Sequence, residues 1–211
     1  MRAGGLRELK KNQTRQLIAD TANALFRARG FDEVTVDEIA AAAQVSKKTV
    51  FNHFPTKEDL VFYRAEDREA MSLAAVTDRP AGFSILDSFR AMCLAQTRFI
   101  PGMRRDLVHP RSFYDLVSGN PSLERKMHEV NERIIEVLAG ALAAEAGAEP
   151  GDPLPRVVAS TLVSAQRALY RRLRQRVREG GPDEEIGRAH RADVERVFDL
   201  LGKGLGGYPQ T

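Results

Sequence analysis

Apolar residues recur every three or four positions through most of this chain, and stretches that alternate apolar and polar residues are nearly absent. A spacing of three and four places side chains on one face of an α-helix, whereas a half-buried strand requires a spacing of two. The pattern therefore predicts an all-α protein with about nine helices. We find no internal repeat that would indicate a solenoid.

The composition limits the classes of protein to which the chain can belong. With 211 residues, of which 43% are hydrophobic, it can bury a sizeable core, and its net charge of +3 permits a nucleic-acid partner without establishing one. Cys93 is the single cysteine, so no intrachain disulfide can form, which fits a reducing cytoplasm. We recognise no export signal and no membrane span, because no run approaches about 18 apolar residues.

Capping and turn signals divide the first part of the chain. Thr35 and Glu38 have the spacing of a capping box, Ser46 can cap a helix that starts at Lys47, and Pro55 ends that helix. Basic residues Arg7, Lys10 and Lys11 precede the first helix. These signals predict a basic N-terminal arm over residues 1–13 and helices over residues 14–29, 35–43, 47–54 and 57 to about 75.

The second part contains longer predicted helices. Asn120-Pro121 has the form of an N-cap followed by proline at the first helical position, and residues 147–155 form a loop rich in proline and glycine. We predict helices over residues 83–100, 120–146, 156–179 and 183–201, with a short or kinked helix near residues 101–110. The expected domains are a DNA-binding domain over residues 14–60, a ligand-binding and dimerisation domain over residues 61–205, and a flexible tail over residues 206–211.

Residues 35–54 have the form of a helix-turn-helix, in which the second helix enters a major groove of DNA. Lys47 and Lys48 lie at the start of that helix, where they can reach guanine or phosphate, and Asn52 offers hydrogen bonds to bases. The flanking candidates are Thr49, His53, which can donate to phosphate, and Phe51, which can contact a thymine methyl group or pack inside the protein. We assign the apolar positions Ile39, Ala40, Ala43, Val45, Val50 and Phe54 to the core.

The stretch Thr-x-x-x-Ile-Ala-x-x-Ala-x-Val-Ser-x-x-Thr-Val-Phe-x-His-Phe-x-x-Lys-Glu-x-Leu, from Thr35 to Leu60, resembles the DNA-binding domain of the tetracycline-repressor (TetR) family. The resemblance covers residues 14–60. It implies that Thr35, Thr49, His53 and Lys57 touch phosphates and that Lys47, Lys48 and Asn52 face bases. Many members of the family have tyrosine at the position of Phe51, so this chain lacks one hydroxyl that could contact phosphate.

For the larger second part, the resemblance implies a ligand-binding domain that dimerises through the last two long helices. Apolar stripes on those helices agree with this role: Val157, Val158, Thr161, Leu162, Ala165, Ala168 and Leu169 on one helix, and Ile186, Val194, Val197, Phe198, Leu201 and Leu205 on the other. A homodimer would present two reading helices to a pseudo-palindromic double-stranded operator.

The effector residues are predicted from composition and helical spacing. An adaptable apolar cavity is indicated by Phe89, Met92, Cys93, Phe99, Met103, Phe113 and Tyr114, although such residues are more often core. The candidate anchors for an anionic head group are Arg98, His109, Arg111, Arg167 and Tyr170. Parts of this half look similar to family members that sense fatty acyl-CoA, which suggests acyl-CoA or another lipid-like anion as the effector.

Other signals are given structural interpretations. Gly202–Gly207 contains Gly-x-Gly-x-x-Gly without a preceding strand, so we interpret it as a tail. We interpret Glu124, His128 and Glu132 as a solvated salt-bridge face without a metal. The arginines of residues 171–178 spread around their helix. No catalytic motif is found, so we expect no enzyme and no cofactor. A lipid or acyl-CoA binding protein without DNA function and an unrecognised enzyme remain as alternatives.

Overall fold

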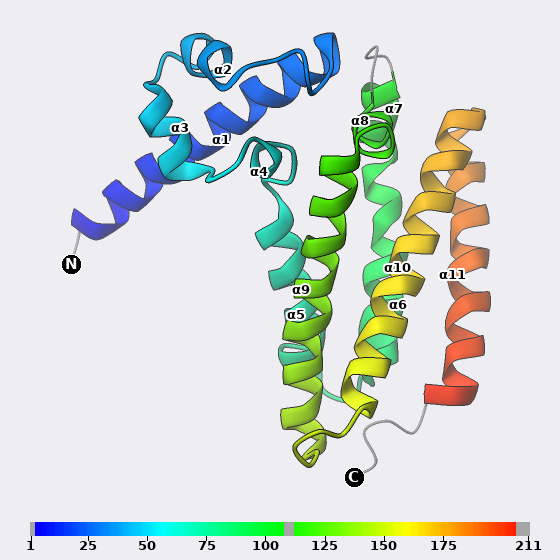
Figure 1. Cartoon of the computed structure of the whole chain (residues 1–211). Coiled ribbons are helices and arrows are strands. Elements are labelled where there is room, and N and C mark those ends of the chain that lie inside the picture. Colours follow the sequence, from blue (N-terminus) through cyan, green and yellow to red (C-terminus); the bar gives the residue numbers. More distant parts are fainter. Residues whose placement is uncertain (1–2, 108–111, 206–211) are drawn as a thin grey trace. The chain divides into compact units, whose positions relative to one another are not determined.

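The structure is a computed structural model, which describes residues 3–107 and 112–205, and these ranges contain helices and no strand (Figure 1). The all-α prediction is confirmed. The elements are α1 (Ala3–Arg29), α2 (Val36–Ala42), α3 (Lys47–His53), α4 (Lys57–Val61), α5 (Ala65–Thr77), α6 (Ile85–Leu94), the 3-10 helix η1 (Ala95–Phe99), α7 (Ile100–Leu107), α8 (Phe113–Ser118), α9 (Pro121–Ala146), α10 (Leu154–Glu179) and α11 (Asp183–Leu205).

Several predicted helix boundaries differ from the structure. The helix predicted over residues 83–100 is divided into α6 and η1. Helix α1 begins at Ala3, and Thr14 lies within it because the Thr14 hydroxyl donates to the Lys10 carbonyl at 3.0 Å and so does not cap a new helix. The predicted helix from residue 57 to 75 is divided into α4 and α5, because the backbone leaves helical geometry at the buried Phe62. Helix α11 continues to Leu205, so the glycine-rich stretch is helical up to that residue. Residues 206–211 lie outside the described part.

The chain forms two compact units. The first comprises Met1–Arg64 and Asp106–His128, and the second comprises Ala65–Arg105 and Glu129–Thr211. The first unit therefore takes in a segment that the sequence-based division at residue 60 leaves in the second domain. The functions assigned to residues 14–60 and 61–205 stay predictions.

The first unit has a core to which α1 contributes one face. Ile18, Ala22 and Phe26 of α1 are buried, and so are Ile39, Ala40, Ala43, Val50 and Phe54 of the predicted helix-turn-helix core, while Val45 is partly buried. Polar contacts attach residues 106–128 to this unit. The side-chain amide of Asn120 donates to both Asp32 carboxylate oxygens at 2.9–3.1 Å, and Lys126 Nζ lies 2.7 Å from Asp59 Oδ1.

The second unit is held by a larger apolar core, which includes Val76, Ile85, Phe89, Cys93, Ile134, Leu138, Leu142, Val158, Leu162, Leu169, Val194 and Phe198. His190 Nε2 lies 2.9 Å from the Cys93 carbonyl oxygen, and Arg176 forms an ion pair with Asp193 between α10 and α11. Burial raises the pKa of the Cys93 thiol to about 12, so this cysteine is not a reactive thiolate at neutral pH.

We expect Leu138→Ala to lower the free energy of unfolding of the second unit by about 3 kcal/mol, because it leaves a cavity at a fully buried position. Leu9→Ala is the matched control, since Leu9 is 53% exposed and both residues favour a helix. Urea denaturation followed by circular dichroism would measure the difference. Equal effects of the two substitutions would contradict the assignment of Leu138 to the core.

Candidate nucleic-acid interface

The helix-turn-helix is held by a cap at the start of each helix. Thr35 Oγ1 accepts from the Glu38 amide at 3.2 Å, and Glu38 Oε2 accepts from the Thr35 amide at 2.8 Å, which confirms the predicted capping box. Ser46 Oγ accepts from the Thr49 amide at 3.0 Å, which confirms the predicted cap of α3. Between the helices, Gln44 adopts a φ of 56°, a left-handed conformation that reverses the chain within a short turn.

Helix α3 presents one exposed face. Lys47, Lys48, Phe51 and Asn52 are all exposed, and their spacing places them together on the side away from the buried Val50. Phe51 keeps 43% of its surface exposed, so a large part of it is not covered by packing. An exposed aromatic ring among polar donors is suited to contact with a base edge or a thymine methyl group. Thr49, beside this face, is partly buried and its hydroxyl lies 2.8 Å from Ser46 Oγ.

The two lysines at the start of α3 differ in their surroundings. Lys47 Nζ lies 2.7 Å from Asp37 Oδ2 of α2, so its charge is paired across the turn. Lys48 forms no ion pair with any residue that the structure describes. An exposed ammonium without an ionic partner has no ion pair to break before it contacts phosphate or guanine. Lys48 is therefore the better placed of the two for a direct DNA contact.

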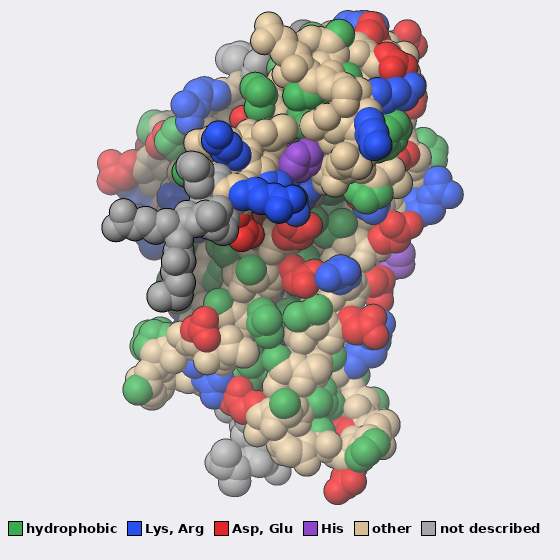
Figure 2. Space-filling view, turned by 90° about the vertical axis from the view of Figure 1, so that its left-hand side faces the viewer, with side chains coloured by type: hydrophobic (Ala, Val, Ile, Leu, Met, Phe, Trp, Pro, Cys, Tyr) green, Lys and Arg blue, Asp and Glu red, His purple; other side chains and the backbone are tan. Residues whose placement is uncertain are grey.

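His53 lies at the end of α3, next to basic residues of α1. The Arg15 guanidinium donates to the His53 carbonyl at 2.8 Å and lies 4.6 Å from the centre of the Phe54 ring. Burial lowers the pKa of His53, and the charges of Lys11 and Arg15 lower it further, so the ring is neutral at pH 7. Figure 2 shows Lys and Arg side chains gathered around a histidine on the face in view.

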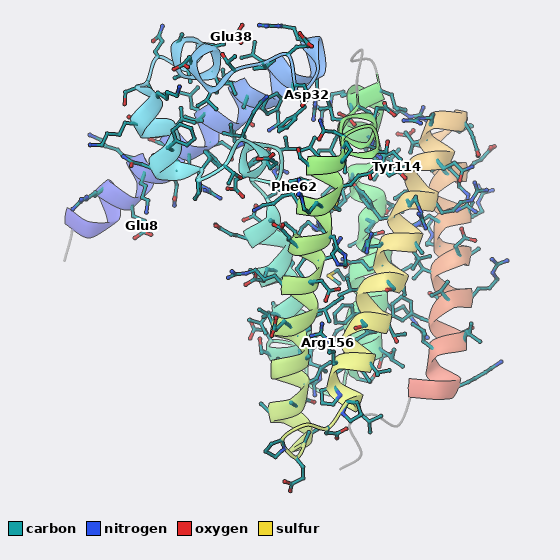
Figure 3. All side chains as sticks on the ribbon, viewed as in Figure 1. Glu8, Asp32, Glu38, Phe62, Tyr114 and Arg156 are labelled. Atoms are coloured by element: carbon teal, nitrogen blue, oxygen red, sulfur yellow. The ribbon has the colours of Figure 1, made fainter. Side chains whose placement is uncertain are left out.

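Lys57 and Thr35 are the predicted phosphate contacts that lie outside α3 in the chain. Lys57 Nζ is 4.3 Å from the centre of the Phe31 ring, and burial lowers the pKa of its ammonium while Asp32, Glu58 and Glu38 oppose this shift. Thr35 is exposed and bound to Glu38, which Figure 3 labels together with Asp32. Their contact with phosphate stays a prediction, and Lys57 also has a packing role that the sequence did not reveal.

Arg15 is a residue of this site that the sequence analysis missed. Its guanidinium donates to the His53 carbonyl at the end of α3 and to the Tyr63 carbonyl beyond α4. The signal available was its spacing of four from the basic Lys11, which places both on one face of α1 once that helix extends to Ala3. The assumption that residues 1–13 are an arm concealed this relation.

The predicted effector residues are distributed over both units. Phe89 is fully buried in the second core and Met103 is 6% exposed, whereas Met92 lies at the edge of that core. Arg167 is exposed, and Tyr170 is partly buried. Phe113 and Tyr114 belong to the first unit, where the rings of Phe113 and Phe62 meet edge to face at 5.8 Å. Arg111 and His109 lie outside the described residues.

Arg98 lies beside a surface pocket of the second unit. Its guanidinium stacks 4.8 Å from the centre of the Phe99 ring. The pocket has a volume of about 340 Å³ and is lined by Thr97, Arg98, Ile100, Pro101, Asp183, Glu184, Gly187 and Arg191. Since Asp183 and Glu184 face it together with Arg98, its charge is mixed and does not favour one sign of ligand.

Glu132, one of the acidic positions of the predicted salt-bridge face on α9, takes part in an ion pair. Glu132 lies 2.8 Å from Arg156, and the described residues contain no group of His, Cys, Asp and Glu arranged to hold a metal. Within the described part of the chain, no helix has the length and apolar character that a membrane span requires.

Two family models match the chain. Residues 18–63 match the model of bacterial regulatory proteins of the tetR family, and residues 84–205 match the model of the MftR C-terminal domain. The chain is 30% identical over 172 residues to the HTH-type transcriptional regulator TcmR of Streptomyces glaucescens, covering 79% of this chain and 76% of TcmR. It is 25% identical to MftR of Mycobacterium tuberculosis, which is named as a regulator of mycofactocin biosynthesis, with 93% of each chain covered.

Solved structures show the same fold. GusR of Salmonella enterica matches with a TM-score of 0.55 and 19% identity, covering 92% of this chain and 96% of GusR. A TetR-family regulator of Mesorhizobium loti matches with a TM-score of 0.54 and 22% identity, covering 90% of this chain and 97% of that protein.

We expect the capping box to make the stability of the first unit depend on pH. The Thr35 amide, and next the Arg29 guanidinium, lower the pKa of Glu38 from 4.5 to about 2. A folded-state pKa below the unfolded value stabilises the protein above the unfolded pKa, and this contribution is lost as the pH falls from about 4.5 toward about 2. Thermal unfolding of the wild type should therefore lose more in Tm between about pH 5 and about pH 3 than that of Glu38→Gln. Glu8→Gln, at an exposed position of α1 (Figure 3), is the control, and a Glu38→Gln profile identical to the wild type would refute the role of the carboxylate.

Proposed function

The chain belongs to the TetR family of bacterial regulatory proteins, and from this membership we propose that it is a homodimeric repressor released from a pseudo-palindromic operator by a small-molecule effector. It is a transcriptional regulator at the level of its family. The observation that supports DNA reading by this chain is the exposed face of α3, where Lys48, Phe51 and Asn52 are held by a capped turn.

In the proposed complex, α3 lies in the major groove. Lys48 and Asn52 contact base edges and Phe51 lies against a thymine methyl group, while Lys47 exchanges Asp37 for a base or phosphate. Thr35, Thr49, His53 and Lys57 contact phosphates on either side. Neutral His53 donates one N–H without adding charge, so the lysines supply the salt-dependent part of the affinity.

The dimer is proposed to form through α10 and α11. Several residues of the predicted stripes, such as Val158, Val194 and Phe198, are buried within the second unit and are not available to a partner. Apolar side chains nevertheless remain exposed on these helices: Leu154 and Val157 on α10, and Leu200 on α11. Val197 and Leu201 beside Leu200 are partly buried. A second copy covering these side chains would remove apolar surface from water and place two α3 helices on one operator.

The effector is proposed to bind in the second unit. Met92, Arg98, Phe99, Arg167 and Tyr170 are the predicted effector residues of this unit that keep substantial exposed surface, and a lipid-like anion or acyl-CoA fits their mixture of adaptable apolar and cationic groups. Effector binding must favour one arrangement of the operator-binding helices over another. Helix α9 and the α4–α5 connection are chain segments shared by both units, and we propose that the coupling passes through them.

Selection of duplexes from a random pool by the purified protein tests the function. We expect enrichment of a pseudo-palindromic sequence, with affinity that falls steeply as salt concentration rises, because several lysines replace counterions on phosphate. Lys48→Ala should lower the affinity for the selected duplex by about 1–3 kcal/mol and relax the preference at one position of each half-site. Lys57→Met, which keeps the aliphatic stem over Phe31, should weaken binding to every sequence alike.

Lys203→Ala is the control for these variants, because it removes the same charge from an exposed position of α11. Its affinity should equal that of the wild type. Binding that is weak and independent of sequence at low salt, with and without lipid anions, would refute the operator proposal. Wild-type preference in Lys48→Ala together with wild-type affinity in Lys57→Met would refute the assigned contacts while leaving the operator proposal intact.

We expect the double substitution Val157→Glu with Leu200→Glu to convert the dimer to a monomer, because buried charges without partners oppose association. Sedimentation velocity would measure the mass, and the monomer should lose at least about 100-fold in operator affinity because each half-site is then bound separately. Met71→Glu, at an apolar position of α5 that is 43% exposed, is the control. An unchanged dimer in the double variant would place the interface elsewhere.

A further inference from the structure

Arg68 of α5 is a partly buried cation of the second unit without an acidic partner. Its guanidinium donates to Asn131 Oδ1 of α9 at 3.2 Å, and Asn131 is only 1% exposed. Among the residues that the structure describes, no carboxylate lies within ion-pair distance of Arg68. Burial lowers the pKa of Arg68, the charge of Arg167 on α10 lowers it further, and Tyr170 opposes this shift.

Many other arginines of this unit do have acidic partners. The ion pairs are Arg79–Glu145, Arg90–Asp199, Arg104–Asp183, Arg133–Glu69, Arg156–Glu132, Arg172–Glu179, Arg176–Asp193 and Arg188–Glu184. Even the exposed Arg133, whose side chain is 75% accessible, has one. A neutral amide compensates only part of the charge of Arg68, and the proximity of Arg167 adds repulsion. The fold therefore maintains an excess of positive charge between α5, α9 and α10.

We infer that Arg68, with Arg167 and Tyr170, binds the negatively charged group of the effector, a carboxylate or a phosphate ester. This inference rests on the proposed effector-binding role of the second unit and adds the residue that fixes the charge of the ligand. A guanidinium presents a planar set of donors that matches both oxyanions in a bidentate manner. Asn131 fixes the orientation of Arg68 through one nitrogen and leaves its other N–H groups for the ligand.

The surroundings indicate that the ligand is amphiphilic. Gln166, Arg167 and Tyr170 share one face of α10, and Gln166 Nε2 lies 3.7 Å from Met92 Sδ of α6. Met92 packs at the edge of the apolar core, and its flexible thioether can adapt to an apolar ligand chain. Helices α5, α9 and α10 run side by side in this unit (Figure 1), and the contacts Arg68–Asn131 and Arg156–Glu132 join them. A charged head at Arg68 would thus lie near apolar side chains.

The first experiment requires no ligand. Arg68→Met replaces an uncompensated cation by an apolar side chain of similar length, so it should raise the Tm of the ligand-free protein by about 2 °C or more. Arg176→Met is the matched control, because Arg176 has an acidic partner in Asp193, and its removal leaves that partly buried carboxylate with only the more distant Arg196, at 3.6 Å. Its Tm should fall. A fall in Tm for Arg68→Met comparable to that of Arg176→Met would show that Arg68 is structural and would overturn the inference.

The second experiment uses three probes with the same alkyl chain, dodecanoate, dodecyl phosphate and dodecanol, below their critical micelle concentrations. Calorimetric titration of the wild type should detect binding of at least one anion and weaker binding of the neutral alcohol. Arg68→Met should bind that anion at least about tenfold more weakly, the loss expected for one charge-assisted contact. The preferred anion identifies the head group as carboxylate or phosphate.

Binding of neither anion, or equal affinity of wild type and Arg68→Met, would overturn the inference. Operator binding by the ligand-free wild type is measured separately, so failure of the regulator proposal is distinguishable from failure of the anion site. A wild type that binds the anion through Arg68 but no operator would retain the site and refute the regulator. A wild type that binds an operator but neither anion would refute the anion site and retain the regulator.

Discussion

The packing of α2 and α3 on α1 is the constraint on which the DNA-binding unit depends. Helices of seven residues are not stable alone in water, so their shape must come from tertiary contacts and caps. Phe26, Ile39 and Phe54 bury completely or nearly so, and Arg15 joins α1 to the last turn of α3. Because each short helix uses its buried face for this core, its opposite face is left free for a ligand. The same packing that stabilises α3 therefore determines which of its side chains are presented.

Several cations of this unit are held by a neighbouring carboxylate, an aromatic ring or backbone carbonyls. Lys47 is paired with Asp37, Lys57 lies over an aromatic ring, and Arg15 donates to backbone carbonyls. These contacts orient the side chains before any partner arrives, which lowers the entropy lost on binding. They also impose a cost, because Lys47 must exchange one carboxylate for another anion. Lys48 has no ion pair to break among the described residues. Its side chain is not held by such a contact, so binding must order it at a cost in conformational entropy.

Local signals predicted most of the first unit, and long-range contacts account for what they missed. Capping by Thr35, Ser46 and Asn120 depends on residues within a few positions, and the structure shows each cap where the sequence places it. The division between α4 and α5, and the membership of residues 106–128 in the first unit, depend on partners far along the chain, such as Phe62 with Phe113 and Asn120 with Asp32. For the site, helical spacing identified the exposed face of α3, but no spacing rule could reveal Lys57 over Phe31. The predicted effector set is divided between units for the same reason, since composition does not specify which helices become neighbours.

The distribution of ion pairs distinguishes cations that stabilise the protein from cations available for binding. A paired arginine such as Arg176 satisfies a carboxylate on another helix, and its charge is largely cancelled at a distance. An unpaired cation leaves its field uncancelled, which destabilises the empty protein and favours an anion from outside. Lys48 has this character on the exposed face of α3, and Arg68 has it in a partly buried position in the second unit. The exposed lysine is solvated and costs little, whereas Arg68 is partly withdrawn from water and its excess charge is a larger cost. Binding of an anion would offset the destabilising effect of the unpaired charge of Arg68. The charge balance of the second unit therefore favours an anionic ligand over a neutral one.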